Sequence, residues 1–132
     1  MAYIRNGILV IVFCIYMAAV FYLCFSNPDQ APQWPDMWLG LPVDKIGHFL
    51  MFLPFPLLGY MVLENDEING WKRLLLLLGM ITAGFAVAAG IEIAQSLLKY
   101  RSAETADLLA DGVGLICGGL IAMTYILIRN RK

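Results

Sequence analysis

The sequence predicts an all-α integral membrane protein built as a bundle of four transmembrane helices. Hydrophobic residues make up 61% of the 132-residue chain, well above the roughly 45–50% that is usual in soluble domains. Charged residues make up 14%, and they fall between long apolar runs instead of alternating along helix faces. Four of these runs are long enough to cross a hydrocarbon core of about 30 Å as helices.

The spans are expected at residues 7–25, 46–63, 74–98 and 108–128, in a single domain that covers residues 1–132. The first follows Arg5 and lacks a convincing small-residue cleavage site, so we interpret it as an uncleaved span. Pro54 and Pro56 predict a kink in the second span because each removes a backbone donor. The third and fourth spans contain glycines and polar residues, but helix is still expected because backbone groups in lipid must be bonded internally.

The first loop, residues 26–45, is expected to lie along the membrane surface. Its four prolines exclude a continuous helix, and Trp34 and Trp38 suit the headgroup zone.

The distribution of Lys and Arg predicts the orientation. The side with both termini and the second loop holds Arg5, Lys72, Arg73, Arg129, Arg131 and Lys132. The opposite side holds only Lys45, Lys99 and Arg101. Because positive residues favour the cytoplasmic side, both termini are expected in the cytoplasm of a multi-pass cell-membrane protein.

Polar residues gather where three predicted spans reach the same membrane face. Parity places the start of the second span, the end of the third and the start of the fourth on one side. Asp44 and His48 lie one turn apart and share a helix face. The candidate ligand-binding residues at these ends are Asp44, Lys45, His48, Glu92, Gln95, Arg101, Asp107 and Asp111. With the predicted orientation, this cluster lies on the extracytoplasmic face.

Small residues indicate that Glu92 and Asp111 face the interior of the bundle. Glu92 shares a stripe with Gly84 and Ala88, and Asp111 shares one with Gly114, and small residues let membrane helices approach closely. A charge near the centre of a span costs about 2.5–3.5 kcal/mol on insertion scales, so a partner or a water-filled cavity is expected. The available partners are Lys45, His48 and Arg101.

Simpler interpretations apply to some of the same residues. Asp44 and Asp107 at helix starts also satisfy free N–H groups as interfacial caps. A lone histidine such as His48 is more often a packed hydrogen-bonding residue than a catalyst. Glu92 is expected to have either a function or an obligatory structural partner.

The composition argues against several classes of ligand. A formal net charge of −1 provides no basic footprint, so nucleic acid is not an expected partner. The chain has no metal-ligand spacing, phosphate loop or nucleophile elbow, so neither a metal nor a cofactor is expected.

Two blocks of sequence resemble the VanZ-like family of membrane proteins. The stretch Asp44-Lys45-Ile46-Gly47-His48-Phe49 is similar to that family's D-K-x-x-H-F opening. The second block is formed by Glu92-x-x-Gln95, Arg101, Asp107-Leu108-Leu109-Ala110 and Gly114. Asp111 stands where the family usually has Asn, and the Pro often found before the Arg is absent. The resemblance implies a link to glycopeptide-antibiotic resistance, chiefly to teicoplanin.

Three functions compete. The first is a cell-envelope protein whose polar pocket binds a lipid headgroup, a cell-wall precursor or a glycopeptide-type amphiphile, with Lys45 and Arg101 meeting phosphate or carboxylate. The second is a small membrane enzyme in which His48, Glu92 or Asp107 performs acid–base chemistry on a lipid-linked substrate. The third is a structural role in which polar pairs join the helices. Membrane lipids are the expected partners in each case. Both a monomer and a homo-oligomer are compatible with the sequence.

Overall fold

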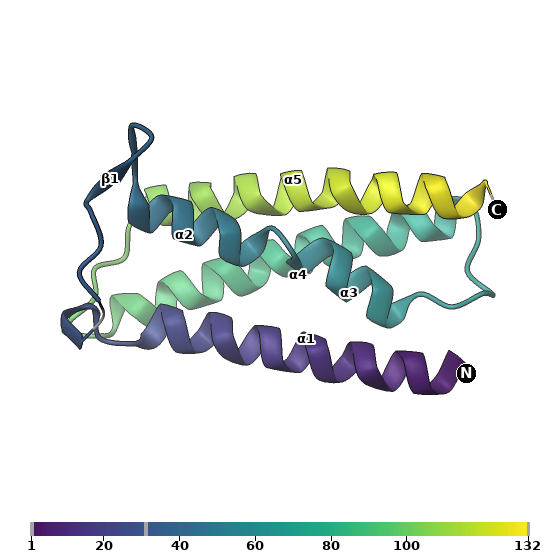
Figure 1. Ribbon diagram of the computed structural model, residues 1–132, viewed down its shortest axis with the longest axis horizontal. Coiled ribbons are helices and arrows are strands. Elements are labelled where there is room, and N and C mark those ends of the chain that lie inside the picture. Colours follow the sequence, from purple (N-terminus) through teal and green to yellow (C-terminus); the bar gives the residue numbers. More distant parts are fainter. Residues whose placement is uncertain (1, 31, 132) are drawn as a thin grey trace.

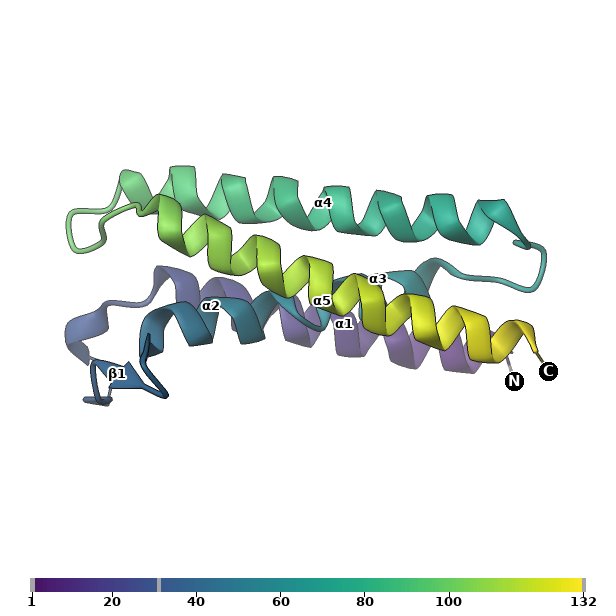
Figure 2. The same cartoon turned by 90° about the horizontal axis from the view of Figure 1, so that it is seen from above.

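The computed structural model describes residues 2–30 and 32–131. Within these ranges, four helical segments are long and apolar enough to cross a membrane, which makes the chain a multi-pass membrane protein of the predicted all-α class. The helices are α1 (Ala2–Phe25), α2 (Val43–Phe52), α3 (Phe55–Leu63), α4 (Trp71–Ser96) and α5 (Thr105–Asn130), and α2 and α3 together form the second segment. Both termini lie at one end of the bundle (Figures 1 and 2).

Most helices extend further than the apolar runs predicted. The second segment begins at Val43 and the fourth at Thr105, whereas α4 ends at Ser96, two residues earlier than expected. Polar and charged residues at these helix ends lower the local hydropathy, so an apolar run marks only the middle of each helix. Asp44 and Asp107 consequently lie in the first turns of α2 and α5 and not before them.

The predicted kink in the second segment is a break in the helix. Pro54 and Pro56 carry no N–H group, so neither can donate to the carbonyl four residues earlier. α2 therefore ends at Phe52, and α3 restarts at Phe55 with a proline in its first turn. Helical hydrogen bonding resumes after the break, where the Leu58 N–H donates to the Pro54 carbonyl at 3.0 Å.

The first loop holds a 3₁₀ turn, Pro28–Gln30, and a two-stranded hairpin of β1 (Met37–Trp38) and β2 (Leu41–Pro42). Leu39 and Gly40 connect the strands with φ values of +53° and +77°. Positive φ at both central residues is the geometry of a two-residue hairpin turn that matches the strand twist. Its position on the membrane surface stays a prediction.

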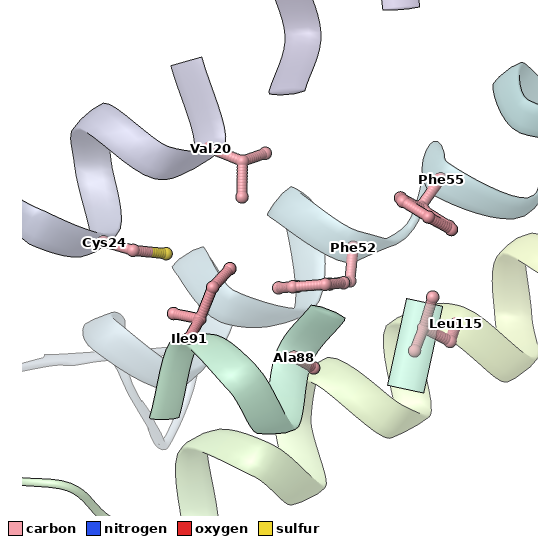
Figure 3. Packing of buried hydrophobic residues seen from close by; sticks show 7 residues of the cluster. All are labelled: Val20, Cys24, Phe52, Phe55, Ala88, Ile91 and Leu115. Carbon is pink, nitrogen blue, oxygen red and sulfur yellow. The ribbon is translucent and has the colours of Figure 1, made fainter. Parts of the chain in front are cut away.

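α5 packs closely against α2 because glycines remove side chains from the contact. A methyl group at Gly114 would overlap the Phe49 carbonyl oxygen, and one at Gly118 would overlap the Leu53 carbonyl oxygen. The core beside this contact contains Phe52, Phe55, Ala88, Ile91 and Leu115, with Val20 and Cys24 from α1 (Figure 3). This packing brings the first turns of α2 and α5 side by side, at the end away from the termini (Figure 1).

Candidate functional site

Two neighbouring helix N-termini form the base of the site. α2 and α5 start at the same end of the bundle, and each presents free N–H groups and the positive end of a helix dipole there. Asp44 lies in the first turn of α2 and Asp107 in the first turn of α5, while Glu104 is the N-cap residue of α5. Carboxylates are favourable at such positions, which explains why acidic side chains accumulate at this end.

Lys45 joins these carboxylates. Its Nζ donates to Asp44 at 2.9 Å, to Glu104 at 2.6 Å and to Asp107. One oxygen from each of the three acids lies within 4.8 Å of the others, a spacing that could hold a metal ion, but the ammonium already contacts all three carboxylates. An anionic ligand would therefore reach Lys45 only by replacing one of these partners.

His48 lies below Lys45, between two carboxylates of α5. Its Nδ1 is 2.8 Å from Asp111 Oδ1, and its Nε2 is 3.6 Å from Asp107 Oδ2. The first distance is a hydrogen bond and the second is too long for one. Asp111 is 1% exposed and His48 is 5% exposed, so the pair is shielded from solvent. An imidazole whose Nδ1 is held by a buried carboxylate keeps its Nε2 available for proton transfer, the arrangement used by general bases.

Glu92 of α4 closes the site from the other side. Its Oε1 accepts a hydrogen bond from the Glu104 backbone N–H, so its partner is a backbone group and not one of the three expected cations. Its Oε2 is buried without a hydrogen-bond partner among the described residues. We use the name polar cluster for the side chains of Asp44, Lys45, His48, Glu92, Glu104, Asp107 and Asp111.

Gln95 and Arg101 hold the end of α1. Three side chains donate to three consecutive carbonyl groups in its last turn: Gln95 to Cys24 at 2.7 Å, Tyr100 to Phe25 at 2.9 Å and Arg101 to Leu23 at 2.8 Å. The last carbonyls of a helix have no donor within the helix, so side chains that supply donors stabilise its C-terminus. These contacts connect α1, which is mostly exposed, to the rest of the bundle.

Two apolar grooves flank α2 beside the polar cluster. The first, of about 730 Å³, is lined by Lys45 together with apolar residues of the hairpin, α2 and α5, including Trp38, Phe49 and Val113. We name it the Lys45 groove. The second, of about 640 Å³, runs between Leu23 of α1, the first loop and α2, and we name it the Leu23 groove.

A comparison of the sequence with family models assigns the chain to a family. A model described as VanZ/LLP1 matches residues 13–129. The chain belongs to the VanZ/LLP1 family. The match covers every residue of the polar cluster and of both sequence blocks that resembled this family. No curated protein and no solved structure shows significant similarity to the chain.

The structure brings some of the predicted site residues of this VanZ/LLP1 protein together and directs others elsewhere. Most of the predicted set belongs to the polar cluster, whereas Gln95 and Arg101 donate to the end of α1. Glu104 was not among the predicted site residues, although its place just before Asp107 put it at the same membrane face.

A second polar cluster at the opposite end was also missed. Buried Glu64, which follows α3, accepts hydrogen bonds from Arg129 and from the Tyr125 hydroxyl, the latter at 3.0 Å, and Arg129 also binds Asp66 at 2.9 Å. Span parity already placed residues 64 and 129 at the same face, so their proximity could have been predicted.

Proposed function

We propose that this VanZ/LLP1 protein is a cell-envelope protein that binds an amphiphile at the extracytoplasmic face, with both termini in the cytoplasm. The observation that carries the proposal is that Lys45 belongs both to the polar cluster and to the lining of an apolar groove. An amphiphile needs a polar site and an apolar surface side by side, and small-molecule sites usually combine apolar walls with a few polar groups. The candidate ligands are a lipid headgroup, a cell-wall precursor and a glycopeptide-type amphiphile.

The direct test uses a substitution that fills the Lys45 groove. Ala110 on α5 lines this groove, and Ala86 on α4 is exposed on the outer surface of the bundle. Lipids that stay with the protein through purification are measured by mass spectrometry for wild type, Ala110→Phe and the matched control Ala86→Phe. Retention that Ala110→Phe reduces and Ala86→Phe preserves supports binding in the groove, whereas equal retention in all three proteins contradicts it.

A cellular test addresses antibiotic tolerance as a consequence of binding. Susceptibility to teicoplanin and vancomycin is compared for cells that express wild type, His48→Ala, Glu92→Gln or the control Asp66→Asn, at equal protein levels in the membrane. Protection by wild type and the control, lost in the two cluster variants, supports the proposal. If wild type gives no protection, antibiotic tolerance is not a function of this protein. Lipid binding is then tested by the lipids that stay with the protein through purification.

One observation favours a second candidate function, a membrane enzyme. His48 is held by buried Asp111 in the geometry of a general base, with Nε2 directed at Asp107. An acid–base enzyme acting on a lipid-linked substrate would change the lipids of the cell. Lipid profiles of cells that express wild type or His48→Gln test this: a species that depends on His48 supports catalysis, and identical profiles argue against it.

A further inference from the structure

The polar cluster carries more negative charge than Lys45 neutralises. Asp44, Glu104 and Asp107 all bind the single ammonium group of Lys45, and three carboxylates against one ammonium leave a formal charge of −2. A carboxylate offers about four lone-pair sites, while the three donors of Lys45 are distributed among three acids. The acids therefore keep unused acceptor capacity.

The surplus charge faces outward. The side chains of Asp44 and Glu104 are 60% and 50% exposed, whereas that of Asp107 is 9% exposed. A second cation can thus reach Asp44 and Glu104 without unfolding the site. An anionic group approaching the same point meets three carboxylates and one ammonium group, and like charges at close range raise its free energy.

The apolar surface around this charge has room for two chains. The Lys45 groove and the Leu23 groove have volumes of about 730 and 640 Å³, and both are lined by Trp38, Ile46 and Leu50. The grooves adjoin at these shared residues. Lys45, which binds Asp44 and Glu104, lines the first groove, and Val43, the neighbour of Asp44, lines the second, so both grooves lie close to the exposed acids. The two grooves match the two acyl chains of a phospholipid.

We infer that the occupant is a diacyl phospholipid whose headgroup carries a primary ammonium group. The ammonium binds Asp44 and Glu104 beside Lys45, and the acyl chains lie in the two grooves on either side of Ile46 and Leu50. This inference rests on the proposed function, because it names the class of amphiphile that the same site takes. The sequence predicted that Lys45 meets a phosphate or carboxylate, whereas the three acids around Lys45 favour a cation.

The test uses the native tryptophans as reporters. Trp38 lines both grooves, and Trp71 begins α4 at the opposite end of the bundle. The double variant Trp34→Phe/Trp71→Phe leaves Trp38 alone, and Trp34→Phe/Trp38→Phe leaves Trp71 as a reference. Phosphatidylethanolamine, phosphatidylglycerol and phosphatidylcholine with identical brominated chains are titrated into full-length protein in dodecylmaltoside micelles, and quenching of fluorescence is followed.

The expected result is saturable quenching of Trp38, with a midpoint about threefold lower for phosphatidylethanolamine than for phosphatidylglycerol. Phosphatidylcholine is expected to bind more weakly than phosphatidylethanolamine because its quaternary ammonium has no N–H to donate. Trp71 is expected to show no headgroup preference. Asp44→Asn combined with Glu104→Gln should abolish the preference at Trp38, Lys45→Met should increase it, and Asp66→Asn at the opposite end should leave it unchanged.

Failure of the inference and failure of the proposed function give different results. Three outcomes with saturable quenching would overturn the ammonium headgroup but keep amphiphile binding. They are equal midpoints for the lipids, a preference for phosphatidylglycerol, and a preference for phosphatidylethanolamine that survives the double acid variant. Phosphatidylcholine binding as tightly as phosphatidylethanolamine also overturns it. Quenching of Trp38 that does not saturate with any of the three lipids overturns the proposed function itself.

Discussion

Gly114→Ala is expected to disturb the fold and the polar cluster together. Gly114 lies on α5, one turn after Asp111, and its α-carbon faces the backbone of α2 at Phe49, the neighbour of His48. A methyl group there would overlap the Phe49 carbonyl oxygen and lie 3.3 Å from the Leu53 nitrogen. Backbone atoms cannot rotate away as a flexible side chain can, so α2 and α5 must separate.

The magnitude follows from the contact distances. Restoring a van der Waals separation requires a shift of about 1 Å between the two helices. The His48–Asp111 hydrogen bond is 2.8 Å long, so the same shift takes it beyond the range of a good hydrogen bond. Overpacking and the weakened buried hydrogen bond together should lower the free energy of unfolding by about 2–4 kcal/mol.

Two assays report these effects separately. Unfolding in mixed detergent and SDS micelles, followed by far-UV circular dichroism, measures stability. Modification by diethyl pyrocarbonate, read from the absorbance of the modified imidazole, measures access to His48, the only histidine of the chain. His48 is 5% exposed in the native protein, so it should react slowly in wild type and faster in Gly114→Ala.

The matched control is Gly90→Ala in α4, where a methyl group meets nothing within 4 Å. It should be neutral or should stabilise the helix by up to about 1 kcal/mol, with unchanged His48 reactivity. The packing argument is refuted if Gly114→Ala is as stable as Gly90→Ala and protects His48 equally well.

Three further predictions concern buried polar contacts. Asp111→Asn keeps an oxygen that can accept from His48 and should change the free energy of unfolding by less than about 1 kcal/mol, whereas Asp111→Leu should cost about 1–3 kcal/mol; SDS unfolding measures both. Arg129→Met leaves buried Glu64 without its partly exposed cation and should cost about 1–3 kcal/mol, and an effect no larger than that of Glu64→Gln would contradict this. Arg101→Met removes a donor from the end of α1. In a protein whose other two cysteines are replaced by alanine, this change should raise maleimide labelling of buried Cys24 about fivefold. Unchanged labelling would show that Arg101 does not hold α1.

Much of the fold could be predicted because lipid leaves the backbone few alternatives. Long apolar runs in a membrane must be helical, and Pro54 and Pro56 must interrupt the backbone hydrogen bonds of their helix. The helix ends were predicted less well, since the headgroup zone tolerates both apolar and charged residues. Val43 and Thr105 begin their helices earlier than the hydropathy of the chain indicates.

The sequence alone determined the four spans, the family and the common membrane face of the residues that carry its motifs. Those properties follow from local composition, from motif spacing and from the parity of the spans. Only the tertiary structure decided the partners: Lys45 binds three acids, His48 lies between Asp107 and Asp111, Glu92 accepts from a backbone amide, and Arg101 holds the end of α1. Pairing depends on the rotation of each helix about its axis and on the close approach of α5 to α2 at its glycines. Both result from contacts between segments far apart in sequence, which no local pattern records.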